Sequence, residues 1–99
     1  MKIFDLMKLD VKSYEKRGVN VFFHNDKFKT RLIVLEAGGK ISPCQMETFV
    51  LFYVLKGEVL LRKIKESSFL KENQIFITEP ALLSMESASG ARLMGIQIK

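Results

Sequence analysis

The stretch that decides the fold is LEAGGKISPCQMETFVLFYVLKGEV, which runs from Leu35 to Val59. Its centre, Phe49 to Leu55, is apolar at every position, so both faces of an extended strand there would be covered. Gly38 and Gly39 break the preceding segment, and Gly57 interrupts the chain shortly after the apolar run. The stretch therefore predicts a two-sided strand between glycine-containing turns.

Outward from this stretch, short runs rich in β-branched and aromatic residues alternate with turn-forming residues. Residues 1 to 18 have no clean period and predict an irregular N-terminal arm with room for one helical turn. Residues 19 to 99 predict a single all-β barrel with about eight strands. The expected strands are residues 19–24, 28–37, 44–56, 58–64, 68–70, 74–78, 81–86 and 91–98.

The composition is that of one compact domain. Of 99 residues, 47% are hydrophobic and 27% are charged, which favours a packed core over disorder. The longest apolar run, Phe49 to Leu55, is far shorter than the roughly 20 residues that cross a bilayer, so we expect no membrane segment. The single cysteine, Cys44, excludes an internal disulfide and a paired-cysteine zinc site. We expect a soluble, cytoplasmic protein.

The net charge of +5 is concentrated in the first part of the chain. Residues 1 to 40 hold nine Lys and Arg against five Asp and Glu, while residues 41 to 99 hold seven against six. A nucleic-acid-binding surface would have clustered cations with interleaved aromatic residues, but here acids are scattered among the cations. We therefore expect no nucleic-acid binding. A regulatory role stays open, in which Lys8, Lys12, Lys16 and Arg17 contact an acidic partner.

The spacing of residues in the deciding stretch resembles the first motif of the cupin family. In that motif a glycine is followed after five residues by His-x-His, then by a glutamate and, after six more residues, by a glycine. Here Gly38 is followed after five residues by Cys44 and Met46, and Val50 is followed after six residues by Gly57. The resemblance implies a double-stranded β-helix, or jelly-roll barrel, of the cupin type.

The second motif of the family would fall on Asn73 to Ser87, where its histidine position lands on Leu83. Cupins hold a metal ion with the histidines and the glutamate of these two motifs. The residues at those positions here are Cys44, Met46, Val50 and Leu83, which offer sulfur or hydrocarbon instead of nitrogen and oxygen. Fe(II), Mn(II) or Ni(II) would lose all its expected ligands, so we expect no such metal and no cofactor.

Without that metal, the favoured function is that of a non-enzymatic cupin. Its barrel cavity is expected to be apolar and either filled or able to bind a small apolar ligand. The resemblance and the alternation of the strands indicate the lining residues of this cavity, which are Cys44, Met46, Val50, Leu83 and Met85.

A cupin enzyme is the alternative, with catalytic residues that the sequence leaves unknown. Cys44 and Met46, at positions i and i+2 of a strand, would share a face and offer a thiolate and a thioether to Cu(I), completed by Met85 or Met94. His24, the only histidine, is either an acid or base at the barrel mouth or a strand-end residue bonded to the adjacent turn.

The two-sided strand also predicts an interface. One face of Phe49 to Leu55 can meet the barrel interior, and the other needs a partner surface. Small cupins generally pair, so we expect a homodimer through this strand. Tyr53 lies by alternation on the face opposite Val50 and Val54, and we expect it to pack in that interface.

Overall fold

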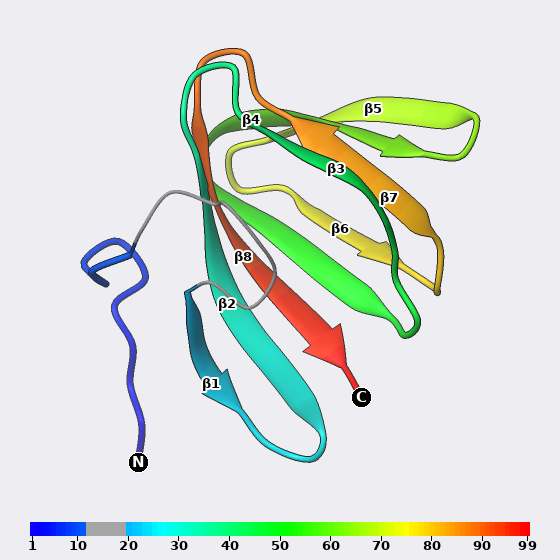
Figure 1. Ribbon diagram of the computed structural model, residues 1–99. Coiled ribbons are helices and arrows are strands. Elements are labelled where there is room, and N and C mark those ends of the chain that lie inside the picture. The colour runs from blue at the N-terminus through cyan, green and yellow to red at the C-terminus, as the bar shows by residue number, and fades with distance from the viewer. Residues whose placement is uncertain (12–19) are drawn as a thin grey trace.

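A computed structural model describes residues 1–11 and 20–99, so the expected boundary between arm and barrel at residue 18 lies outside the described residues. The described residues contain eight strands and no helix, which confirms the predicted all-β class (Figure 1). They include no helix long and apolar enough to cross a bilayer. The strands are β1 (Val21–His24), β2 (Phe28–Leu35), β3 (Lys40–Gln45), β4 (Val50–Lys63), β5 (Glu66–Lys71), β6 (Ile75–Thr78), β7 (Leu82–Glu86) and β8 (Ala91–Ile98).

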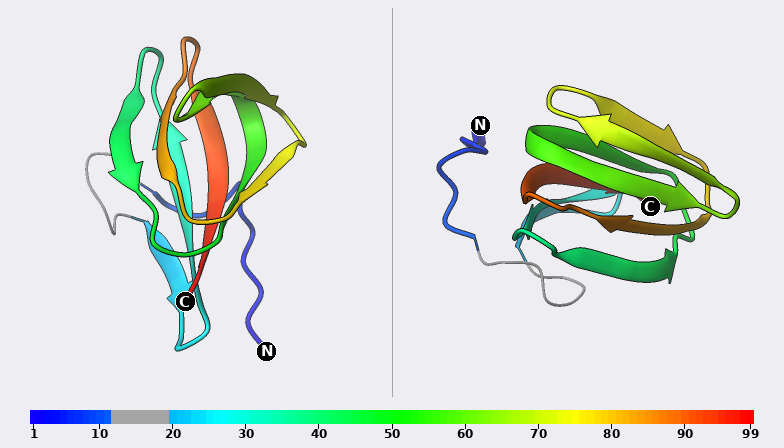
Figure 2. Two further views of the ribbon diagram at one scale, coloured as in Figure 1. Left: turned by 90° about the vertical axis from the view of Figure 1, so that its right-hand side faces the viewer. Right: turned by 90° about the horizontal axis from the view of Figure 1, so that it is seen from above.

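Every strand pair is antiparallel, and the sheet curls over itself into two layers (Figure 2). The first layer has the order β1, β2, β8, N-terminal half of β4, β6. The second layer has the order β5, C-terminal half of β4, β7, β3. Because β4 belongs to both layers, it closes the curled sheet into the jelly-roll arrangement that the cupin resemblance predicted.

The structure corrects the predicted strands in the deciding stretch. Instead of one strand over residues 44–56, it has β3, a loop at residues 46–49, and then β4, which runs unbroken through Gly57. Gly57 has a φ of +82°, and the register against β8 shifts between Val54 and Lys56. A bulge bends a strand without ending it, so Gly57 marks a corner inside one strand and not a boundary between two.

The beginning of β3 was also missed. Pro43 interrupts the apolar pattern there, yet it lies within β3, where the register against β7 shifts between Ile41 and Cys44. An edge strand with a bulge tolerates a residue that lacks an N–H donor. The other strand predictions agree with the structure to within two residues at each end, and β8 agrees at both ends.

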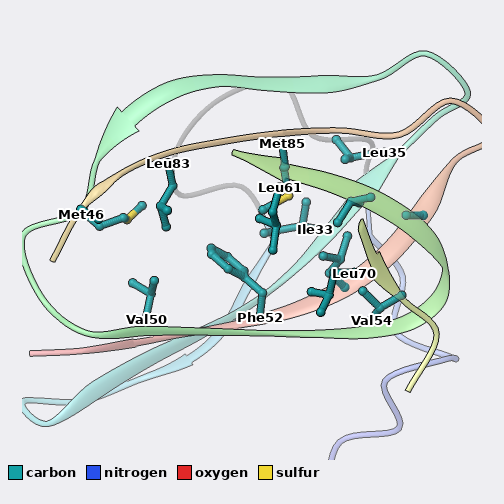
Figure 3. Packing of buried hydrophobic residues seen from close by; sticks show 14 residues of the cluster. Ile33, Leu35, Met46, Val50, Phe52, Val54, Leu61, Leu70, Leu83 and Met85 are labelled. Atoms are coloured by element: carbon teal, nitrogen blue, oxygen red, sulfur yellow. The ribbon is translucent and has the colours of Figure 1, made fainter. Parts of the chain in front are cut away.

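The hydrophobic core lies between the two layers (Figure 3). β4 contributes Val50, Phe52 and Val54 from its first half and Val59 and Leu61 from its second half. The buried positions change from even to odd numbers along β4 because the bulge at its centre inserts one residue and reverses the side-chain alternation. One strand therefore supplies the core from both layers.

The described part of the N-terminal segment makes a single turn, in which the amides of Lys8 and Leu9 donate to the carbonyl of Asp5 at 3.0 and 3.1 Å. Arg92 on β8 holds this turn. Its Nε donates to the carbonyl of Leu6 at 2.9 Å, and its Nη2 donates to the carbonyl of Leu9 at 3.2 Å. Hydrogen bonds from Arg92 to backbone carbonyls thus hold the turn against the first layer. The side-chain pattern of the sequence does not reveal such bonds, because their acceptors are backbone atoms.

Candidate functional site

The residues expected to line the barrel cavity gather around two adjoining cavities. Cys44, Met46, Leu83 and Met85 line one of them, and Met46 and Val50 line the other. Met46, Val50 and Leu83 point toward one another at one end of the core (Figure 3). We call this region the barrel mouth and define it by the residues that line the two cavities, which are Lys29, Arg31, Ile41, Cys44, Met46, Val50, Phe52, Leu83, Ser84, Met85, Gly95, Ile96 and Gln97.

The elements of both layers position these side chains. Cys44 lies on β3 in register with Leu83 on β7, so the two side chains lie next to each other on the second layer. Val50 begins β4 in the first layer, across the barrel from them. Met46 lies in the loop between β3 and β4, where its amide donates to the carbonyl of Ala81 at 2.8 Å. The backbone therefore fixes a loop residue at the mouth.

The mouth is packed and not hollow. Each of its two cavities has a volume of about 20 Å³, which suffices for a single water molecule. Val50 is 2% exposed, Leu83 is 4% exposed and Met46 is 9% exposed. Any larger occupant would have to displace a side chain, and the unbranched thioether of Met46 is the lining side chain best suited to move.

Four polar residues of the mouth were not singled out in the sequence, namely Lys29, Arg31, Ser84 and Gln97. Lys29 and Arg31 share the inward-facing parity of Ile33 on β2, and both are half-buried. Across the pair with β8, Lys29 is in register with Gln97. The alternation of β2 held a signal for them, because residues two and four positions before a core isoleucine face the same side. The sequence analysis did not place Lys29 and Arg31 in the interior because charged residues at the end of a strand usually face solvent.

Gly95 on β8 leaves space in the mouth for the ring of Phe52. A Cβ atom on this residue would lie 3.3 Å from Cε1 of Phe52 and 3.6 Å from Cδ1 of Ile33. Gly95 is in register with Arg31, and the Phe52 ring lines both cavities beside that arginine. The missing side chain therefore makes room for an aromatic ring next to a cation.

Three sulfur-containing side chains share the mouth, and a fourth does not. Cys44, Met46 and Met85 line the same cavity, whereas Met94 alternates with the buried Leu93 and so lies on the outer face of β8. Since β3 ends at Gln45, Cys44 and Met46 do not share one strand, which corrects the expected i, i+2 geometry. One thiol and two thioethers form a donor set that suits a soft ion such as Cu(I).

No group of three or more His, Cys, Asp or Glu side chains within residues 1–11 and 20–99 could hold a metal ion. His24 lies at the exposed end of β1, in register with Lys29, and lines neither cavity of the mouth. Tyr53 lies on the outer face of the first layer, where its hydroxyl donates to Oδ1 of Asn73 at 2.8 Å. Three of the four cations in the proposed acidic-partner surface, at positions 12, 16 and 17, lie outside the described residues.

Solved structures with the same arrangement identify the fold. The protein TT1209 from Thermus thermophilus is 26% identical over 97% of this chain and 95% of its own, with a TM-score of 0.84. KdgF from a Halomonas species is 15% identical over 98% and 94%, with a TM-score of 0.81. A cupin superfamily protein from Desulfitobacterium hafniense is 10% identical over 91% and 98%, with a TM-score of 0.76.

The sequence matches no protein-family model, and no curated protein matches it. The curled antiparallel sheet and the cupin structures that it superimposes on nevertheless agree with the motif spacing around Gly38 and Gly57. The chain is thus a small domain with the cupin fold.

Proposed function

We propose that this protein is a non-enzymatic cupin whose barrel mouth binds a small organic ligand. One observation carries the proposal. The side chains at the four positions where the family holds its metal, Cys44, Met46, Val50 and Leu83, all line the mouth. These four side chains have no nitrogen or oxygen donors, so this part of the mouth is apolar, and an apolar surface contributes to binding mainly through the hydrophobic effect.

The polar groups around this site support binding more than catalysis. Lys29, Arg31 and Gln97 are polar or charged side chains that can orient a ligand in an otherwise apolar site. His24 lines neither cavity of the mouth, so the acid-base alternative gains no support from its position.

The five methionines provide the test, because they report on different parts of the molecule. Met46 and Met85 line the mouth, Met94 lies on the outer face, and Met7 is exposed in the N-terminal segment. In protein labelled with ¹³C at the methionine methyl groups, we expect butanoate or 1-butanol to shift the NMR signals of Met46 and Met85 saturably. The signals of Met7 and Met94 should stay unchanged.

A pair of neighbouring leucines gives the matched control for this titration. Leu83→Phe adds volume inside the packed mouth and should weaken the response, whereas Leu82→Phe changes an exposed position of the same strand and should leave it intact. If neither probe moves the Met46 and Met85 signals in the unmodified protein, or if all five methyl signals move together, the proposed binding site is wrong.

A soft-metal site is the second candidate, and it is favoured by the three sulfur side chains that share one cavity. Anaerobic titration with Cu(I) would then shift the Met46 and Met85 signals at one equivalent, and Cys44→Ser would abolish the shift. Metal that elutes with the protein in less than stoichiometric amounts, with no such shift, would eliminate this candidate.

A further inference from the structure

The first layer places two cations and an amide side by side at the mouth. Lys29 and Arg31 are two residues apart on β2, so their Cα atoms are roughly 7 Å apart and their side chains leave the same face of the strand. Gln97 lies directly opposite Lys29 on the neighbouring strand β8. Long flexible side chains at this spacing can reach a common group, and all three can donate hydrogen bonds.

The opposite wall of the mouth is apolar. Met46, Leu83 and Met85 face the cations with thioether and hydrocarbon surface. Among the described residues that line the two cavities, none is acidic. The described lining therefore has one wall with two cationic side chains and one wall with apolar surface.

The position of Arg31 adds to this asymmetry. It lines both cavities together with Met46 and Phe52 and is half-buried, so part of its side chain is withdrawn from water. A charged group in such surroundings interacts most strongly with an oppositely charged partner. A guanidinium in particular matches a carboxylate with two parallel hydrogen bonds.

We propose that the ligand of the mouth is a short-chain organic carboxylate. Its carboxylate binds to Lys29 and Arg31, and its hydrocarbon part displaces the Met46 side chain and packs against Val50 and Leu83. This inference rests on the proposed binding function and adds the chemical class of the ligand. Because each cavity holds about one water molecule, the hydrocarbon part has only the space that the Met46 side chain vacates, and this limits it to a short chain. The half-buried cations leave the head group near the rim.

The experiment compares four probes of matched size in the methionine NMR titration: butanoate, 1-butanol, butylammonium and inorganic phosphate. We expect butanoate to bind at least tenfold more tightly than 1-butanol, because hydrogen bonds between two charged groups are roughly twice as strong as those between neutral groups. Butylammonium should not bind. Phosphate should bind more weakly than butanoate, since it has no hydrocarbon part for the apolar wall.

Charge-removing variants then assign the preference to the two residues. Lys29→Met and Arg31→Met should each reduce the affinity for butanoate about tenfold and leave that for 1-butanol nearly unchanged. Lys71→Met, which removes a lysine from β5 outside the mouth, should change neither affinity. If Arg31→Met does not fold, Arg31→Lys keeps the charge but loses the paired hydrogen bonds and should still weaken butanoate binding.

The outcomes separate the two proposals. Equal affinities for butanoate and 1-butanol would overturn the carboxylate inference and leave the binding function intact. Phosphate binding as tightly as butanoate would also overturn it, because the apolar wall would then contribute nothing. No response to any probe would overturn the binding function itself. An equal loss of butanoate affinity in Lys71→Met would show a general charge effect and contradict the assignment to Lys29 and Arg31.

Discussion

At the scale of single residues, three positions in the described part of the chain have positive φ angles without being glycine. Two of them are Asn20 and Asn73, with φ angles of +65° and +66°. Asparagine adopts this region at little cost because its short side chain can hydrogen-bond locally. The third is Ile64, at +49°, whose β-branched side chain makes the same conformation strained.

Ile64 therefore predicts a stabilising substitution. It lies in the turn between β4 and β5 and is 77% exposed, so its side chain contributes little burial in the single chain. Ile64→Asn should raise the free energy of unfolding by about 1 kcal/mol, because the left-handed region costs most residues about 1–2 kcal/mol. Urea denaturation measures the change. Lys65→Asn, at the other turn position, should alter it by less than about 0.5 kcal/mol, and an equal gain there would contradict the strain argument.

Some residues of the mouth could be predicted from the sequence, and others could not. Cys44, Met46, Val50 and Leu83 could be named in advance because their spacing resembles that of the cupin metal-binding motifs. Lys29 and Arg31 could not, because a charged residue at a strand end faces either the interior or the solvent, and only the packing of the opposite layer decides which.

At the scale of elements, β4 determines how the two layers join. Its fourteen residues cross from one layer to the other at the bulge around Gly57. The hydroxyl of Ser87 donates to the carbonyl of Glu58 at 2.6 Å and accepts the amide hydrogen of Gly90 at 3.0 Å, which fastens the turn between β7 and β8 to this corner. A Cβ atom on Gly57 would collide with the carbonyl oxygen of Gly90. The corner therefore requires glycine for two reasons, its backbone conformation and its lack of a side chain.

These two requirements can be separated experimentally. Gly57→Ala should destabilise the protein by more than about 2 kcal/mol, since strain from the positive φ and overpacking against Gly90 add together. Gly38→Ala is the matched control, because Gly38 has a similar φ of +80° but nothing within 4 Å of its added Cβ. It should lose only about 1 kcal/mol in the same denaturation experiment. Equal losses would show that the close contact at the corner has no energetic effect.

At the scale of the whole molecule, the outer face of the first layer has an apolar surface on β4 and β6. Leu51, Tyr53 and Leu55 on β4 are half-buried there, and the adjacent edge strand β6 carries Ile75 and Ile77, which are 51% and 58% exposed. A contiguous apolar face beside an open strand edge is typical of a surface that associates with another copy. We therefore propose that two chains pair through this face, as the two-sided strand predicted.

The proposed dimer makes a measurable prediction. Light scattering coupled to size exclusion should give the mass of two chains, and Ile77→Glu should convert it to the mass of one, because the substitution places a charge in the apolar contact. Leu82→Glu alters an exposed leucine on the second layer, 44% exposed, and should leave the dimer intact. A single-chain mass for the unmodified protein, or dissociation of both variants, would contradict an interface on the first layer.

Local patterns along the chain were enough to predict the all-β class, the approximate positions of most strands and the cupin-like spacing of Gly38, Cys44 and Gly57. These properties depend on local alternation, on turn-forming residues and on short-range spacing, all of which are written along the chain. Three properties became known only from the folded chain: Gly57 bends one strand instead of ending it, the mouth is packed, and Lys29 and Arg31 face Met46 and Leu83. These properties depend on pairing between strands far apart in sequence, and local alternation does not specify which distant strand covers which face.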